Sequence, residues 1–184
     1  MRIVAGRHRG RRLDAPAGRD SRPTADRARQ ALFNILAHAE GTPLAGARVV
    51  DCFAGTGALG LEALSQGAAH ASFVEAHPAA LTALRANIAA LGETARTTVL
   101  RADATRPPTT SHPCGLAFLD PPYHVGLAGP CLTALAERGW LTENALAVVE
   151  VAAREDFAAP IGFAITDERV YGAARLVFLR RSAI

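Results

Sequence analysis

An acid, two consecutive prolines and an aromatic residue follow an apolar segment in the stretch LAFLDPPY, residues 116–123. Proline has no backbone N–H to donate, and it holds the residue before it in an extended conformation. Asp120, Pro121 and Pro122 therefore form a stiff turn whose carboxylate and carbonyl oxygens accept hydrogen bonds. A substrate suited to this turn carries an –NH2 group, and Tyr123 adds a ring on which a flipped base can stack, worth about 1–3 kcal/mol.

The amine of adenine or guanine is a poor nucleophile because its lone pair is delocalised into the ring. Two acceptors that hold its hydrogens localise the lone pair, and Asp120 stabilises the positive charge that develops on nitrogen in a water-poor site. A bare D-P-P can also be an ordinary turn. In this context we interpret the catalytic residues as Asp120, Pro121, Pro122 and Tyr123.

A glycine-rich loop lies upstream, directly after a predicted strand. The segment DCFAGTGALG, residues 51–60, contains G-x-G-x-x-G at Gly55, Gly57 and Gly60. Such a turn lets a ligand approach the backbone at the mouth of a strand–helix unit, where open α/β sheets bind nucleotides. Glu75 ends the next predicted strand, twenty residues after Gly55, and is suited to ribose hydroxyls.

The acids beside the loop decide between two classes of cofactor. A dinucleotide would lay its pyrophosphate on the helix N-terminus, where Asp51 would repel it. S-adenosylmethionine instead carries a sulfonium and an ammonium group, which a carboxylate complements. Asp103 closes the third predicted strand and could meet the adenine amino group. The sequence therefore predicts S-adenosylmethionine as the cofactor.

Alternating apolar segments and amphipathic helices predict the elements that position these residues. Buried strands are expected at 47–53, 70–76, 97–103, 115–120 and 144–151, and helices at 22–39, 58–67, 78–92 and 126–138. This alternation favours a mostly parallel, Rossmann-like α/β sheet with helices on both faces. The tail after residue 162 predicts two antiparallel strands joined around Tyr171 and Gly172.

The N-terminus carries most of the positive charge. Residues 1–29 hold nine arginines against three aspartates, a balance of +6, whereas the other residues balance to −3. Clustered arginines indicate contact with nucleic acid, and a solvated basic arm is the alternative. We expect residues 1–20 to form a small basic β-hairpin outside the core, and residues 21–184 to form the catalytic domain.

Composition argues against several other classes. The three cysteines are widely spaced, without CxxC or zinc-ligand spacing, so neither a metal site nor a disulfide is expected. No apolar run reaches the ~20 residues that span a bilayer, and no signal-peptide pattern opens the chain. We expect a cytoplasmic protein that does not associate with membranes.

Taken together, DCFAGTGALGLEAL, FVEA, RADA and FLDPPY resemble the class I methyltransferases that modify exocyclic amino nitrogens. With RIVAGRHRGRRL and RPTADRARQALFNIL at the N-terminus, the chain resembles the RsmD family of bacterial guanine-N2 methyltransferases, which act on small-subunit (16S) ribosomal RNA. The resemblance implies a seven-stranded sheet with a reversed final hairpin. Cofactor contacts would fall to Asp51, Ala54, Gly55, Gly57, Glu75 and Asp103, with Arg22 and Thr24 closing over the site. RNA contacts would fall to Arg7, Arg9, Arg11, Arg12 and Arg27.

Three alternatives stay open at this point. Adenine-N6 methylation of DNA or RNA uses D-P-P-Y as well, although a DNA enzyme usually needs an added recognition domain. Methylation of a protein glutamine would call for Asn in place of Asp120, and a non-catalytic RNA-binding assembly factor could retain a vestigial pocket. This sequence departs mildly from the family pattern at Cys52 and in the loop at 105–113. The expected partner is small-subunit RNA in an assembled or partly assembled 30S particle, bound by a monomer.

Overall fold

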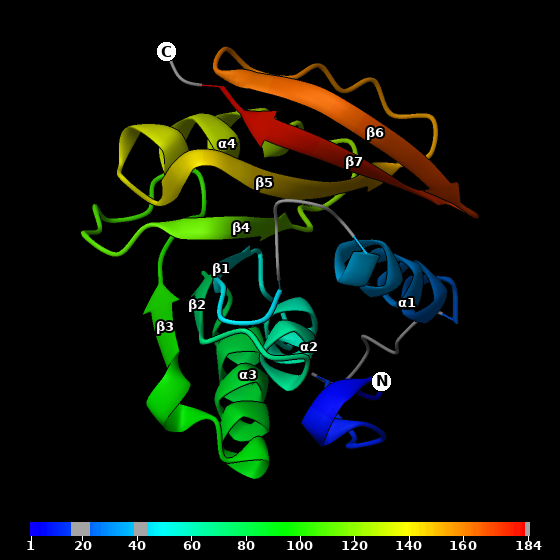
Figure 1. Ribbon diagram of the computed structural model, residues 1–184, viewed down its shortest axis with the longest axis vertical. Coiled ribbons are helices and arrows are strands. Elements are labelled where there is room, and N and C mark those ends of the chain that lie inside the picture. The colour runs from blue at the N-terminus through cyan, green and yellow to red at the C-terminus, as the bar shows by residue number, and fades with distance from the viewer. Residues whose placement is uncertain (16–22, 39–43, 183–184) are drawn as a thin grey trace.

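Seven strands form one sheet in the computed structural model, which describes residues 1–15, 23–38 and 44–182, with only the backbone described at 23–26. The strands are β1 (Arg48–Cys52), β2 (His70–Glu75), β3 (Thr97–Arg101), β4 (Cys114–Leu119), β5 (Leu141–Ala152), β6 (Phe163–Tyr171) and β7 (Ala174–Arg181). Their order is β3-β2-β1-β4-β5-β7-β6, with β1 to β5 parallel and β7 antiparallel to both neighbours (Figure 1). The predicted Rossmann-like sheet and reversed hairpin are confirmed.

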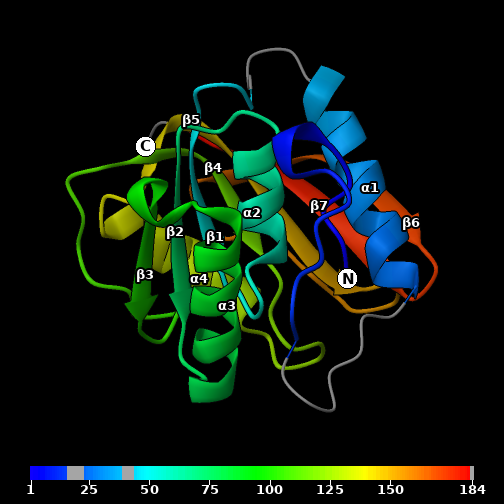
Figure 2. The ribbon, with the colours of Figure 1, turned by 90° about the horizontal axis from the view of Figure 1, so that it is seen from below.

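Helices cover both faces of this sheet (Figure 2). They are α1 (Pro23–His38), α2 (Ala58–Ser65), α3 (Pro78–Leu91) and α4 (Ala128–Glu137). One apolar cluster joins α1, α2 and α3 to the sheet through residues such as Phe33, Leu61 and Leu84, and a second cluster joins α4 to the opposite face through Leu132 and Leu135. Among the described helices, none is long and apolar enough to cross a membrane.

Strands β4 and β5 are in register toward the carboxyl end of the sheet and irregular at the other end. In β4 and β5, Cys114 pairs with Leu141, but Leu116 pairs with Leu146, so β5 contains extra residues at its start. Asn144 within this bulge has a φ of 59°. The irregularity therefore lies where β5 begins, away from the edge at which the predicted site residues gather.

The N-terminal segment forms a short, irregular hairpin. Its two arms are joined by one antiparallel bridge, between Arg2 and Arg12, and by further backbone hydrogen bonds, and a 3-10 turn (Gly6–His8) lies between them. Ile3 and Leu13 are each 2% exposed and belong to the core cluster of α1 to α3. The expectation that this segment lies outside the core is wrong, because these apolar residues point inward. The boundary at residue 20 lies outside the described residues and stays a prediction.

Side chains of α2 hold the N-terminal segment in place. The buried carboxylate of Glu62 accepts hydrogen bonds from the backbone N–H groups of Val4 (2.8 Å) and Ala5 (2.9 Å). Ser65 donates its hydroxyl to the carbonyl of Ala5. Gly6 lies so close to the helix that a Cβ atom there would come within 1.9 Å of the Ser65 carbonyl oxygen. The basic segment is therefore a fixed part of the surface.

Candidate functional site

The carboxyl ends of β1, β2 and β4 meet around a cavity of about 590 Å³. This volume lies within the usual range of small-molecule sites, about 300–1,000 Å³. The cavity is lined by Phe53, Glu75, Ala76, His77, Pro78, Asp120, Pro121, Pro122 and Tyr123. Glu75, which binds the glycine loop, and Asp120 of the D-P-P-Y turn are 45 residues apart in the sequence but line the same cavity.

The D-P-P-Y turn is placed where β4 leaves the sheet. The N–H of Asp120 still donates to the carbonyl of Cys52 on β1 (3.4 Å), and the prolines that follow have no N–H with which to continue the pairing. Pro121 is buried and Pro122 is exposed. The Tyr123 hydroxyl donates to Oε1 of Glu150 (2.5 Å), so its ring is held at the cavity wall rather than free to turn.

Glu150 is a site residue that the sequence reasoning missed. Phe118 on β4 pairs with Val148 on β5, and two residues further along each strand the side chains return to the same face of the sheet. Asp120, directly after β4, and Glu150, on β5, therefore lie next to each other on the same face of the sheet. The signal was present in the parallel patterns FLD and VVE, but the sequence alone does not give the register between the two strands.

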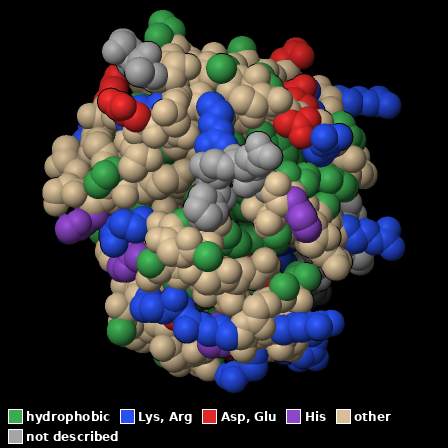
Figure 3. Space-filling model, viewed as in Figure 1, with side chains coloured by type: hydrophobic (Ala, Val, Ile, Leu, Met, Phe, Trp, Pro, Cys, Tyr) green, Lys and Arg blue, Asp and Glu red, His purple; other side chains and the backbone are tan. Residues whose placement is uncertain are grey.

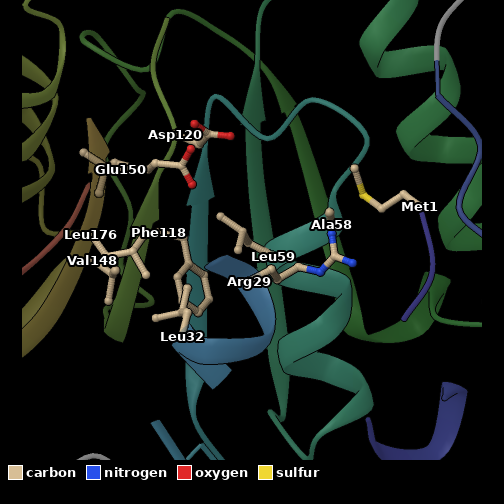
Figure 4. Close-up of a pocket in the computed structure, with 11 residues that line it drawn as sticks. Met1, Arg29, Leu32, Ala58, Leu59, Phe118, Asp120, Val148, Glu150 and Leu176 are labelled. Atoms are coloured by element: carbon tan, nitrogen blue, oxygen red, sulfur yellow. The ribbon is translucent and has the colours of Figure 1, made fainter. Parts of the chain in front are cut away.

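Asp120 and Glu150 also line a second, narrower cavity of about 80 Å³ (Figure 4). Its other lining residues are Met1, Arg29, Leu32, Ala58, Leu59, Phe118, Leu119, Val148 and Leu176. Figure 4 shows the two carboxylates at one end, above the apolar side chains of Phe118, Val148 and Leu176. The cavity therefore combines apolar walls with two carboxylates at one end, and Asp120 belongs to both cavities.

Arg29 is positioned differently from Arg27 on the same helix. Arg27 is exposed, whereas Arg29 is only 6% exposed and donates to the carbonyl of Arg2, with Nε 3.9 Å from Oε2 of Glu62. Arg29 therefore joins α1 to the N-terminal segment while lining the second cavity.

Two carboxylates fix the glycine loop through backbone donors. Gly55 donates its N–H to Oε2 of Glu75 (2.8 Å), and His77 donates to Oε1 (2.7 Å). Asp51 accepts the N–H of Gly60 in the first turn of α2 (2.8 Å). One of the donors that would face an anion at this helix end is therefore already bound to a carboxylate.

The three glycines of the motif serve different ends. Gly55 has a φ of 56°, and a Cβ there would come no closer than 3.9 Å to another atom, so the loop is open to a ligand at this point. A Cβ on Gly57 would lie 2.3 Å from a methyl of Leu84, and one on Gly60 would lie 2.4 Å from the ring of Phe73. Both are packing glycines, and the cofactor contact at Gly57 stays a prediction.

Asp51 is 1% exposed, and its environment disfavours the ionised form. Burial raises its pKa well above the ordinary value, and the charges of Asp120 and Glu75 raise it further, while the hydrogen bond from Gly60 opposes the shift. A cation placed nearby would reverse this balance. The site therefore concentrates negative charge that a cationic ligand would neutralise.

The other predicted cofactor residues are less closely associated with the cavity. Asp103 is exposed and accepts two hydrogen bonds from Thr105, which lower its pKa, and it does not line the cavity. Ala54 is 8% exposed, and its N–H donates to Val74. Arg22 and the side chain of Thr24 lie outside the described residues.

Structural interactions divide the predicted RNA-binding arginines into two groups. Arg7 pairs with the buried carboxylate of Glu93 (2.6 Å), and Arg11 donates to the carbonyl of Ala90. Arg9 and Arg12 are exposed, and within the described part of the chain their side chains form no hydrogen bond or ion pair. Figure 3 shows arginines gathered on the lower part of the molecule, where the N-terminal segment lies in Figure 1.

Two backbone positions beside the site are strained. Phe53, after β1, has a φ of 59°, and His124, after β4, has a φ of 61°. Residues other than glycine rarely adopt such values, which often occur at functional sites. Phe53 lines the larger cavity, as do Ala76, His77 and Pro78, which the sequence reasoning did not assign.

Comparison with known proteins identifies the family. The family model described as Conserved hypothetical protein 95 matches residues 1–180. The chain is 36% identical to ribosomal RNA small subunit methyltransferase D of Escherichia coli K12, over 100% of this chain and 91% of that protein. The protein of the same name from Haemophilus influenzae is 33% identical over 94% and 89%. The solved structure of the Escherichia coli protein yhhF has a TM-score of 0.85 at 36% identity, covering 100% of this chain and 99% of that one. The chain thus belongs to the ribosomal RNA small subunit methyltransferase D family.

Proposed function

We propose that this protein transfers a methyl group from S-adenosylmethionine to the exocyclic N2 amine of a guanine in small-subunit (16S) ribosomal RNA. The observation that carries the proposal is the shared cavity, in which Asp120, Pro121, Pro122 and Tyr123 face the Glu75 side of the glycine loop. The names of the curated relatives, which are small-subunit RNA methyltransferases, support the substrate class.

The residues of the larger cavity fit this cofactor. When bound, S-adenosylmethionine would supply a methyl group activated on a sulfonium, whose S–C bond breaks as the N–C bond forms and leaves a neutral thioether. Glu75 offers carboxylate oxygens to ribose hydroxyls, and Asp51 lies behind the loop as a negative charge for cationic groups. A dinucleotide pyrophosphate fits less well, because the Asp51 carboxylate already accepts the Gly60 N–H at the start of α2.

Asp120 is the proposed catalytic residue. Its carboxylate accepts a hydrogen bond from the amine and stabilises the positive charge that develops on nitrogen as the new N–C bond forms. The nitrogen gives up one proton, which a carboxylate oxygen of Asp120 accepts. The backbone carbonyls of the two prolines hold the second hydrogen, and the Tyr123 ring supports the flipped base.

Arg9 and Arg12 supply the proposed positive surface for RNA phosphates, together with Arg27 on α1. Each is exposed, and the anchoring of the N-terminal segment on Glu62 and Ser65 gives the first two a fixed position. We propose that the monomer acts on an assembled or partly assembled 30S particle, since so small a protein has little surface for reading sequence by itself.

The test is methyl transfer from labelled donor to unmodified 30S subunits and to naked 16S RNA, followed by nucleoside analysis. N2-methylguanosine is expected, with more transfer to the particle than to naked RNA. N6-methyladenosine would replace the proposal with the adenine alternative. No transfer, together with no donor binding by calorimetry, would favour a non-catalytic assembly factor.

Asp120→Ala tests the catalytic assignment. We expect donor binding to stay largely intact while the rate of methyl transfer falls by at least about 10²-fold, the range found when one transition-state hydrogen-bonding group is lost. Asp156→Ala is the matched control, because Asp156 is exposed and lies outside both cavities. Equal loss of binding and transfer in Asp120→Ala would show that Asp120 belongs to the cofactor site.

A further inference from the structure

We propose that Glu150 selects guanine over adenine by accepting a hydrogen bond from N1–H of the base, beside the N2 amine held by Asp120. This inference rests on the proposed function and adds a specificity-determining residue to it. It begins from the position of Glu150, which lines the second cavity together with Asp120 and holds Tyr123 of the D-P-P-Y turn.

The sheet register places the two carboxylates side by side. Phe118 and Val148 are paired on parallel strands, and Asp120 and Glu150 are the next residues on the same face. In Figure 4 both carboxylates lie at the same end of the cavity. A ligand that presents several N–H donors along one edge could therefore donate to both carboxylates at once.

The Watson–Crick edge of guanine has this pattern of donors. N1–H and the two N2 hydrogens lie next to one another, so one carboxylate can receive N1–H while the other receives the amine. Adenine presents an unprotonated N1 beside its amine, and this acceptor would face the Glu150 carboxylate without a proton between them. Leaving a buried acceptor unpaired is what gives polar sites their large discrimination.

The Glu150 carboxylate is held in position by Tyr123. Oε1 accepts the Tyr123 hydroxyl, and among the described residues no other hydrogen bond or ion pair is formed by this carboxylate. Oε2 is therefore available to a ligand while the Tyr123 bond fixes the rotamer. The apolar side chains of the second cavity, among them Phe118 and Val148, provide walls against which the edge of a heterocycle can lie.

A simpler role is that Glu150 only positions Tyr123. The two roles differ when the base is changed. 2-Aminopurine keeps the amine at C2, and so can be methylated, but its N1 is an acceptor like that of adenine. A residue that only positions Tyr123 would affect guanine and 2-aminopurine equally, whereas a residue that reads N1–H would not.

The experiment compares methyl transfer to two reconstituted 30S particles whose 16S RNA carries guanine or 2-aminopurine at the target nucleotide, which is first located with the wild-type protein. Wild-type protein should prefer guanine in kcat/KM. E150Q replaces one acceptor by an –NH2 donor, keeps the side-chain shape and can still accept from Tyr123. We expect the preference for guanine to fall by about tenfold to a hundredfold, the range of one specific base contact.

Two further variants keep the result interpretable. Y123F removes the hydroxyl but leaves the Glu150 carboxylate, so the guanine preference should persist even if both rates fall. E143Q makes the same change at an exposed position near the start of the same strand, and it should behave as wild type.

The outcomes separate the inference from the proposed function. Failure of wild-type protein to methylate guanine N2 would overturn the proposed function. If guanine is methylated but E150Q leaves the guanine to 2-aminopurine ratio unchanged, or Y123F changes it as much as E150Q does, the inference is wrong. Loss of the ratio in E150Q alone supports it.

Discussion

Replacing Glu62 by Gln should release the N-terminal segment from α2. The Glu62 carboxylate is fully buried and accepts the backbone N–H groups of Val4 and Ala5 and the side-chain amide of Gln66. Glutamine has almost the same shape but only one oxygen. Whichever way its amide turns, an –NH2 group faces a backbone N–H group, and the nearby guanidinium of Arg29 loses its negative partner.

The size of the effect follows from these contacts. A hydrogen bond to a charged group contributes about 1.5–3 kcal/mol, and a buried donor left without an acceptor costs a similar amount. With one such donor lost, Glu62→Gln should lower the free energy of unfolding by about 2–3 kcal/mol. For a chain of 184 residues this corresponds to a decrease in Tm of about 5–10 °C.

Thermal unfolding measures the loss of stability, and amide hydrogen exchange measures the release of the N-terminal segment. We expect the decrease in Tm and faster exchange at Val4 and Ala5, with a smaller change in the central strands. RNA affinity should fall, because Arg9 and Arg12 lose their fixed position, while affinity for the methyl donor stays close to wild type. Glu137→Gln, an exposed change on α4, serves as the control. Unchanged Tm and unchanged exchange at both amides would refute the anchoring role of Glu62.

Two other predictions concern the charges of the site and of its surroundings. The pKa of Asp51 is raised above its ordinary value of 3.8, so its contribution to stability is full below that pH and is lost as pH rises through the folded-state pKa. Asp51→Asn should therefore gain stability relative to wild type as pH rises, measured by urea unfolding without ligand, and should lose affinity for the methyl donor. A pH-independent difference in stability would contradict the assigned burial effect. Replacing Arg9 and Arg12 together by Ala should reduce the slope of log RNA affinity against log salt concentration by about 1.4–1.8, the value for two phosphate contacts. The same change at Arg138 and Arg169 should leave the slope unchanged. An equal reduction in both double variants would indicate a non-specific effect of net charge.

The sequence predicts the sheet well because its signals are local. The apolar strands alternate with helices that carry their own boundaries, such as Pro78 at the start of α3 and Gly92 with a φ of 70° at its end. The D-P-P-Y turn is likewise contained in four consecutive residues. Such features need no knowledge of distant contacts.

The features that the sequence did not reveal all depend on contacts between distant segments. Glu150 reaches the site through strand register, and Glu62 holds an N-terminal segment 57 and 58 residues away. The resemblance assigns Arg7 to RNA contact together with Arg9, Arg11 and Arg12, but Arg7 is paired with the buried carboxylate of Glu93. Tertiary pairing therefore separates the structural charges from those available to a ligand.

The bulge at the start of β5 has a consequence for how sequences of this fold can change. Because the extra residues between Leu141 and Leu146 leave the pairing of Phe118 with Val148 intact, an insertion or deletion near Asn144 alters the length of the strand's first half only. The same change between Val148 and Glu150 would turn the carboxylate to the opposite face of the sheet. Length variation can thus be tolerated at one end of β5, while the spacing at the other end is held fixed by the sheet.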